Sequence, residues 1–539
     1  MSPTRWALPR ALSLSCLVTL LAAAPAAAQY FAPALQSLDL STGSVSRSPR
    51  LLGMGGLSTV IPDRDASFSL WDFARIPVGL GTDDTTSSLD LRPGTDALSS
   101  VRRLPAGRER QNLAARSSLA NIEAVYRSRE SGGMFGVVGD LSGLRWDHPY
   151  SASIEQREGL SHPEVLSVLG GRFQKLFGGN MRWATHLRFR GESVEDRFRS
   201  IVLNSAGEYL DQSGDELPPP GEFVPTDVNV NTLAYGFSTS FDLGGRSQFA
   251  MGIERENNDI KSTNDLQRSS SEFSEPRPYW IGQATFVGGI GRTFEYGVDG
   301  VGRVSNSEAD WRFTASAGVG AVPLSGRGNL LNREEHSSEL HARAHWSPGR
   351  ATFAGSVSTA ASEVIIDPPN ANDPTTLNKF INAAFVRPGA DTLSFPDSVT
   401  HTDTDRRAWG WVGGASYRFG RTTLGAEVHW SRDVRGSEFL GDGPRRIAWD
   451  VRTGLEHPLG QRMSARLGYA YRSVDEDDFT AGNEYIGHAF SVGWGYLPAA
   501  SAWSLETGYA LEFRNQDFQS AADERQSRQN LALQLHWAF

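Results

Sequence analysis

The sequence lacks the residues and motifs of the common enzyme sites. Of its 539 residues only Cys16 is a cysteine, and it lies in the first apolar stretch, so the rest of the chain cannot form an internal disulfide or a cysteine-based metal site. No serine-hydrolase, zinc-protease or phosphate-loop motif occurs either. We therefore expect no enzyme activity, no catalytic residues, no cofactor and no metal. A hydrolase with residues scattered over several strands stays open as a minor alternative.

Basic residues are scarcer than acidic ones, and two of them belong to a predicted signal peptide. Arg5 and Arg10 precede an apolar run that ends in small residues at Ala28, the order of charged, apolar and small residues in a secretory signal. A membrane anchor is the alternative, but the run is rich in alanine and contains Pro25. Removing residues 1–28 leaves 50 of the 52 basic residues against 62 acidic ones, a net charge of −12. This balance disfavours nucleic-acid binding.

Long apolar runs are missing after residue 28, and alternation with a period of two replaces them. At the C-terminus, Leu531, Leu533 and Leu535 share one face of a predicted strand with Trp537 and Phe539. The same pattern predicts eighteen strands: 84–92, 117–128, 132–146, 163–177, 180–198, 229–244, 247–264, 278–289, 293–311, 334–348, 350–366, 402–419, 421–436, 444–458, 461–476, 483–497, 501–514 and 527–539.

The spacing of these strands favours a membrane barrel over a soluble sandwich. The segments are longer than most soluble strands, and their connections alternate between short turns and long polar loops, the latter at 200–228, 266–277, 312–333 and 367–400. A chain without membrane helices can cross lipid only as a closed barrel. We expect an all-β, transmembrane, antiparallel up-and-down β-barrel over residues 84–539, with about 18 strands and with 16 or 14 as alternatives.

The polar face of several predicted strands should line the lumen. Its charged residues are interpreted as an ion-pair network along the wall, with a path for an anionic head group as the sharper alternative. Two of them, His341 and His345, are too far apart along one strand to share a metal ion. The candidate lumen-lining residues are Arg182, His186, Arg188, Arg190, Arg343, Glu427, His429, Arg466 and Glu506.

Two segments resemble those of known outer-membrane proteins. The end of the chain, with Leu535, Trp537 and the terminal Phe539, looks like the signal presented to the barrel assembly machinery. Residues 50–56 (RLLGMGG) and 63–80 resemble the N-terminal segment of FadL-like and PorV-like proteins, although Ile76 and Val78 depart from its pattern. The resemblance implies that residues 29–83 contain a hatch folded into the lumen, with candidate residues Gly53, Gly55, Gly56, Asp63, Asp65, Trp71, Phe73 and Pro77.

The resemblance also implies a function. We expect an outer-membrane channel for hydrophobic or amphipathic small molecules, in the cell outer membrane of a Gram-negative-type bacterium after signal-peptide export. A barrel that docks or scaffolds partner proteins is the alternative, motivated by the loops at 200–228 and 367–400. Residues 48–80 would in another interpretation be a periplasmic lead-in to the first strand. The expected partners are outer-membrane lipid, the assembly machinery and a hydrophobic small molecule; the oligomeric state stays open.

Overall fold

The computed structural model describes the barrel strands and one short part of the N-terminal region. The described residues are 48–57, 59–61, 87–103, 112–127, 134–151, 154–173, 181–199, 202–203, 209–210, 223–244, 247–266, 269–315, 324–367, 402–437, 441–477, 482–498, 502–518 and 522–539. The predicted signal peptide and the hatch candidates Asp63, Asp65, Trp71, Phe73 and Pro77 lie outside them.

Within these ranges one antiparallel sheet of 18 strands makes up nearly the whole fold. A five-residue helix, α2 (Pro49–Gly53), precedes it, and a two-stranded sheet of β6 (Val202–Leu203) and β7 (Tyr209–Leu210) stands apart. The strands of the main sheet are β1 Ser88–Arg103, β2 Asn112–Arg127, β3 Met134–Ser151, β4 Ile154–Phe173, β5 Met181–Arg199, β8 Phe223–Gly244, β9 Ser247–Leu266, β10 Ser269–Ile290, β11 Phe294–Ala315, β12 Leu324–Trp346, β13 Ala351–Asp367, β14 Thr402–Phe419, β15 Thr422–Ser437, β16 Gly441–Pro458, β17 Met463–Asp477, β18 Gly482–Tyr496, β19 Trp503–Phe518 and β20 Ala522–Ala538.

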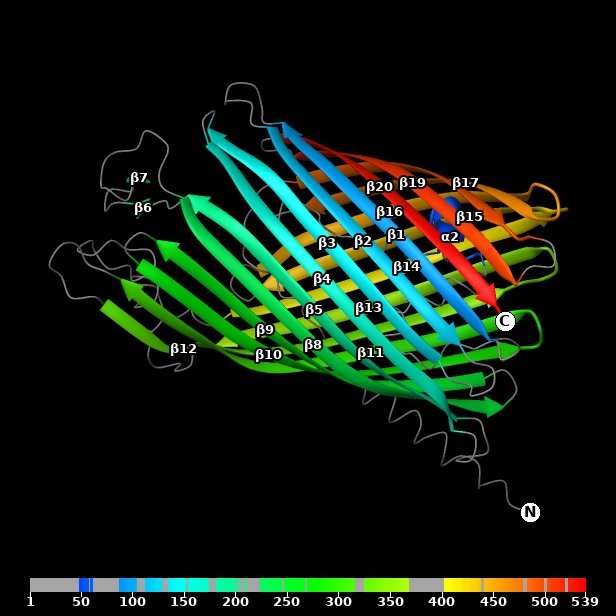
Figure 1. The fold of residues 1–539 in the computed structure, drawn as a ribbon, viewed down its shortest axis with the longest axis horizontal. Coiled ribbons are helices and arrows are strands. Elements are labelled where there is room, and N and C mark those ends of the chain that lie inside the picture. The colour runs from blue at the N-terminus through cyan, green and yellow to red at the C-terminus, as the bar shows by residue number, and fades with distance from the viewer. Residues whose placement is uncertain are drawn as a thin grey trace, which may run out of the picture.

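The sheet closes on itself. Each strand pairs with the next strand of the sheet along the chain, and β1 pairs with β2 on one side and with β20 on the other. The tilted strands surround a central lumen (Figure 1). The predicted antiparallel up-and-down barrel is therefore confirmed, and the described sheet has 18 strands rather than 16 or 14.

The strands reach further toward the long-loop end than the sequence pattern indicates. β10 begins at Ser269 and β12 at Leu324, inside the predicted loops 266–277 and 312–333, so those loop limits are wrong. The first strand is also misplaced, since β1 begins at Ser88 and ends at Arg103 rather than covering 84–92. Near this end both faces of a strand are polar, so the alternation fades while the backbone ladder continues.

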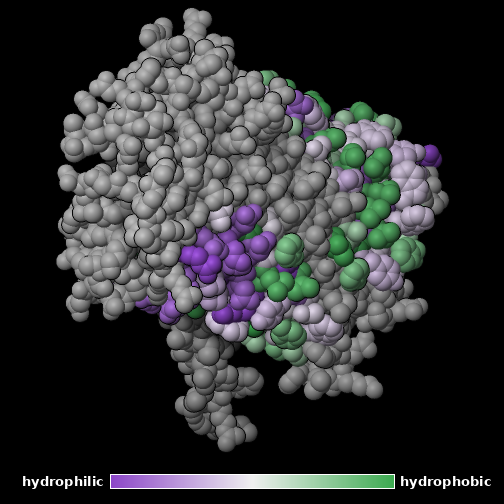
Figure 2. Space-filling view, turned by 60° about the vertical axis from the view of Figure 1, so that its left-hand side comes forward, coloured by the Kyte–Doolittle hydropathy of each residue, from purple (hydrophilic) through white to green (hydrophobic). Residues whose placement is uncertain are grey.

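The two faces of the barrel carry opposite chemistry. Large apolar side chains are exposed on the outer face, for example Ile253, Trp280 and Val492, whereas charged groups such as Glu427 and Arg466 are buried on the inner face. Figure 2 shows hydrophobic side chains grouped over one part of the outer surface, with a hydrophilic group beside them. No helix in the described residues has both the length and the apolar character needed to cross a membrane.

Candidate functional site

Residues 48–61 pack against the inner face of the barrel wall at strands β14 to β19, which are distant from this segment in the sequence. Helix α2 begins where Ser48 caps it, its hydroxyl accepting a hydrogen bond from the Leu51 N–H at 3.3 Å. The chain then turns sharply at Gly55 and Gly56, whose φ angles of 78° and 75° lie in the left-handed region that glycine tolerates. In Figure 1, α2 appears beside the strands of the second half of the barrel.

A row of wall glycines receives this segment. One glycine comes from each of six successive strands, β14 to β19: Gly414, Gly425, Gly454, Gly468, Gly493 and Gly508.

A Cβ atom at any of these six positions would lie 3.0 Å or less from an atom of residues 48–61. At Gly468 it would lie 1.9 Å from the Gly55 nitrogen, and at Gly508 it would lie 2.3 Å from the Pro49 carbonyl oxygen. Real Cβ contacts are essentially never this short, so four of the glycines meet the segment's backbone, and Gly414 and Gly425 receive the side chains of Val60 and Leu57. The row of wall glycines is required because a side chain at these positions would displace residues 48–61.

Glu427 anchors the far end of the segment. Its Oε1 accepts hydrogen bonds from the backbone N–H groups of Thr59 at 2.6 Å and Val60 at 2.7 Å. Its other oxygen is 3.0 Å from Nε2 of His429, and its side chain is fully buried. The Ser416 hydroxyl donates to the Val60 carbonyl at 3.0 Å. A buried carboxylate without such donors would be strongly unfavourable, so these contacts tie the segment to the wall.

The glycine turn is anchored by two further wall residues. The Gly55 N–H donates to Oγ of Ser491 at 2.8 Å, and the Gly56 carbonyl accepts from Nη1 of Arg452 at 2.6 Å. The Arg452 guanidinium also binds Asp450, at 2.8 Å from Nη2. The last carbonyls of helix α2, those of Leu51 and Leu52, accept from the backbone N–H groups of residues 54–56 within the segment, so the barrel pairs with the groups of the turn that follows the helix.

A chain of charges joins the start of the segment to the wall. Arg50 binds Glu456 through two hydrogen bonds of 3.1 and 2.7 Å. Arg466 contacts the same carboxylate at 2.8 Å and reaches Glu506 at 3.0 Å. Since each cation faces a carboxylate, this part of the lumen is electrically balanced rather than cationic.

Apolar packing completes the interface. Leu51, Met54, Leu57, Val60 and Ile61 form a buried cluster against which Ala354 of β13 packs. The side chain of Leu57 lies close to the Cβ positions of the wall glycines on β15 and β16. The segment thus buries its apolar side chains in the lumen, where the wall offers glycine instead of bulky residues.

The other predicted lumen residues form separate clusters. His186 lies 2.5 Å from Glu254 and is buried, while Arg188 bridges Glu254 and Glu256. Arg343, on β12, is half exposed and lies 3.9 Å from Asp299. The structure therefore does not bring the predicted set into one site.

The structure describes some of the predicted site residues only in part. Arg182 and Arg190 lie on β5, but their side chains are outside the described part of the chain. Of the candidate hatch residues, only the glycines at 53, 55 and 56 are described. At the C-terminus, Leu535 pairs with strands on both sides, and the Phe539 ring stacks on Tyr126 at 6.1 Å.

Sequence reasoning included Glu427 and Arg466 among the lumen-lining residues but missed the other residues that hold the segment. Arg452 and Glu456 belong to β16 and Ser491 belongs to β18, and the six wall glycines are spread over almost a hundred residues of sequence. Glycine content is high throughout the chain. Only the pairing register shows that one glycine per strand falls on a common line.

Comparisons with known proteins give distant similarities. No protein-family model matches the chain, and no curated protein matches it. The ferric yersiniabactin uptake receptor FyuA from Yersinia pestis is 10% identical, with a TM-score of 0.41, over 85% of this chain and 81% of its own. The toluene transporter TodX from Pseudomonas putida is 10% identical, with a TM-score of 0.37, over 91% and 98%. A FadL homologue from Pseudomonas aeruginosa is 11% identical, with a TM-score of 0.36, over 91% and 98%. Similarities this weak carry no argument about function.

Proposed function

We propose that this chain is an outer-membrane channel for hydrophobic or amphipathic small molecules, and that residues 48–61 are part of a luminal hatch that moves off the wall during transport. The docking of this segment on the wall glycines is the observation that carries the proposal. A barrel of 18 strands encloses a lumen wider than wall side chains alone fill. A segment folded back into the lumen would block passage through such a barrel.

The surface under the hatch supports the substrate class. Leu57 and Val60 fit against Gly414, Gly425 and Gly454, so displacement of the segment would leave a strip shaped for apolar groups. Charged residues around the strip, such as Arg466 with Glu506, already have partners. An apolar or amphipathic ligand would therefore find contact area without an excess of one charge.

The cellular setting belongs to the same proposal. The apolar outer face is suited to lipid. Phe539 lies at the seam where β20 meets β1, a place consistent with a role in barrel assembly, and export by the signal peptide is proposed from the sequence alone. A protein-docking scaffold remains the second candidate from the sequence. Most of the loops that motivated it, 200–228 and 367–400, lie outside the described residues.

Two measurements test the proposal. Deletion of residues 48–80 should raise the conductance of the protein in planar bilayers, because the lumen loses its hatch; unchanged conductance would contradict the hatch. Cells that express the full chain should take up a long-chain fatty acid or an aromatic hydrocarbon faster than cells without it. Equal uptake rates would reject transport and favour the scaffold.

A further inference from the structure

The ladder between β10 and β11 is interrupted near the long-loop end of the barrel. Ser274 pairs with Asp310 and Tyr279 with Ser305, but the backbone pairing of β10 with β11 skips residues 275–278, while their pairing with β9 continues. Pro276 and Pro278 have no N–H to donate. Residues two apart direct their backbone groups to the same neighbouring strand, so both prolines remove donors from one side of β10.

The inner side of this interruption is occupied by buried charges. Glu275 contacts Arg277 at 2.5 Å and accepts a hydrogen bond from Ser307 at 2.8 Å. Glu335, behind them, accepts from Tyr279 at 2.9 Å and from Arg333 at 3.2 Å. The two arginines are therefore already bound by wall carboxylates.

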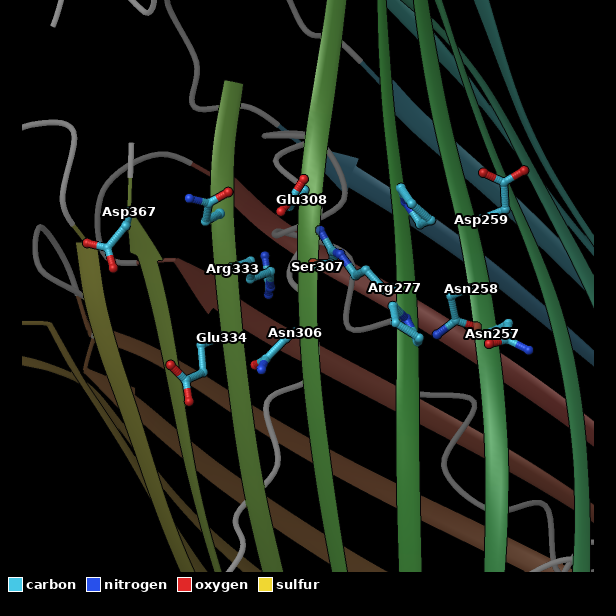
Figure 3. Close-up of a pocket in the computed structure, with 13 residues that line it drawn as sticks. Asn257, Asn258, Asp259, Arg277, Asn306, Ser307, Glu308, Arg333, Glu334 and Asp367 are labelled. Atoms are coloured by element: carbon cyan, nitrogen blue, oxygen red, sulfur yellow. The ribbon is translucent and has the colours of Figure 1, made fainter. Parts of the chain in front are cut away.

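The outer side is a cavity of about 560 Å³ formed by β9 to β13. Its lining combines amides, carboxylates and proline rings, among them Asn257, Asp259, Asn306, Glu308 and Glu334 (Figure 3). Asn257, Asn306, Glu308 and Glu334 are exposed. They alternate along their strands with the buried residues of the inner face, so the cavity opens outward rather than into the lumen.

The lining chemistry selects the ligand class. The described cations at the lining are already held by carboxylates: Arg277 by Glu275, Arg333 by Glu335 and Lys261 by Asp259. His336 likewise lies 2.6 Å from Glu334, so a phosphate would have to compete with a carboxylate for each of these groups. Within the described residues no cluster of acidic or histidine side chains is arranged to hold a metal ion. Carboxylates accept hydrogen bonds from hydroxyl groups, and amides both accept and donate. Proline rings add apolar contact for the C–H face of a ring.

The position of the cavity indicates how such a ligand would arrive. Pro278 lies two residues from Trp280, and Asn257 lies four from Ile253; both apolar residues are exposed on the same outer face. At about 3.3 Å per residue, the cavity begins roughly 7 Å beyond the apolar band. This is the level at which lipid headgroups meet a barrel.

The geometry points to a binding site for the sugar of a glycolipid headgroup on the outer face of β9 to β13. The inference rests on the proposed membrane placement but not on transport. Hydroxyl groups of the sugar bind the amides and carboxylates, and the ring lies against Pro276 and Pro278. The prolines part β10 from β11, which makes room for the ligand without opening the lumen.

The test uses the full-length protein in nanodiscs. The probes are core oligosaccharide released from lipopolysaccharide, whole lipopolysaccharide of the same core, and inorganic phosphate. Asn306→Trp should fill the cavity and weaken oligosaccharide binding at least tenfold, and Glu308→Gln with Glu334→Gln should weaken it without added bulk. Arg407→Gln is the matched control, since Arg407 is exposed on the outer face of β14 away from the cavity; its affinity should stay within twofold of wild type.

The outcomes separate the sources and the alternatives. Tighter binding of the lipid-linked sugar than of the free oligosaccharide assigns the site to a headgroup, and equal binding assigns it to a free saccharide. Wild-type affinity in Asn306→Trp, no saturable binding, or competition by phosphate would overturn the inference. Heat-modifiable migration in gels confirms that each variant barrel is folded. If the protein binds the sugar but shows no uptake activity, the sugar site is supported and only the proposed transport function is rejected.

Discussion

Gly468 on β17 and Gly55 in the N-terminal segment meet through their backbones, so that a Cβ on residue 468 would lie 1.9 Å from the Gly55 nitrogen. The same Cβ would lie 2.3 Å from the carbonyl carbon of Met54. The strand backbone at Gly468 is fixed by pairing with β16 and β18. The segment, held by a few contacts, is therefore the part that would yield.

Gly468→Ala should release the segment while the barrel stays folded. Overpacking of this kind typically costs about 1–3 kcal/mol, and moving residues 48–61 away from the wall relieves it. We expect hydrogen–deuterium exchange in residues 48–61 to rise at least tenfold and bilayer conductance to increase. Gly487→Ala is the control, because Gly487 is on the inner face of β18 and its nearest neighbours are wall side chains at 3.3 Å or more. Equal exchange in both variants would contradict the role of the glycine row.

A disulfide between residues 60 and 425 should lock the hatch. A Cβ at Gly425 would lie 3.5 Å from Cγ2 of Val60, so a cysteine sulfur in place of that carbon can reach a cysteine at residue 425, and the side-chain tips of Leu57 and Ile61 beside this Cβ must shift. The predicted mature chain has no other cysteine. Oxidised Val60→Cys/Gly425→Cys protein should lose uptake, and reduction should restore it. Uptake by the single variant Gly425→Cys should change with neither oxidation nor reduction. Continued uptake by the oxidised double variant would show that the segment need not move.

The ion pair between Asp96 and Arg528 should stabilise the seam that closes the barrel. Asp96 on β1 accepts hydrogen bonds of 2.6 to 3.0 Å from Arg528 on β20, and both side chains are nearly buried. Removing one partner of a buried pair costs about 3–5 kcal/mol. A double-mutant cycle of Asp96→Ala and Arg528→Ala, measured by urea unfolding in vesicles, should show strong coupling. The exposed pair Arg407 and Asp405 should show a coupling energy of about 0–1 kcal/mol. Similar coupling energies for the two pairs would contradict the prediction.

The loss of stability caused by an added charge should distinguish the lipid-facing apolar band from the polar rim of the barrel. Ile253→Arg places a cation among exposed apolar side chains and should lower the free energy of unfolding by about 2 kcal/mol, toward the lower end of the cost of an arginine on a lipid-facing strand. Asn257→Arg, four residues along the same face of β9, should change it by less than about 1 kcal/mol. Folding measurements in lipid vesicles compare the two. Equal losses would contradict the proposed position of the membrane.

The strands could be predicted because each carries its own signal. Alternation in Leu531, Leu533 and Leu535, for example, predicts both that a strand exists and which face meets lipid. All eighteen predicted strands overlap a strand of the sheet, and the ends at short turns agree within a few residues. Several ends at long loops disagree, most clearly the starts of β10 and β12, whereas the ends of β13 and β14 that border the loop 367–400 agree within two residues. The added residues of β10 and β12 are mostly polar residues and glycine, which do not show the alternation that a local pattern needs.

The site could be predicted only in part. The candidate glycines at 53, 55 and 56 lie against the wall as described, yet nothing in the local sequence names their partners. Arg50 and Glu456 are 406 residues apart, and Thr59 and Glu427 are 368 apart. No spacing rule reaches over such separations.

Alternation along the chain by itself determined that this protein is a barrel of about eighteen strands with a polar interior, because each strand is read locally at a period of two. The tertiary structure decided which interior residues meet. Closure of β1 on β20 and the register of β14 to β19 place six glycines in one row and Glu427 beneath Thr59. Contacts between distant residues depend on the register of every intervening pair, which is a property of the closed sheet and of no single strand.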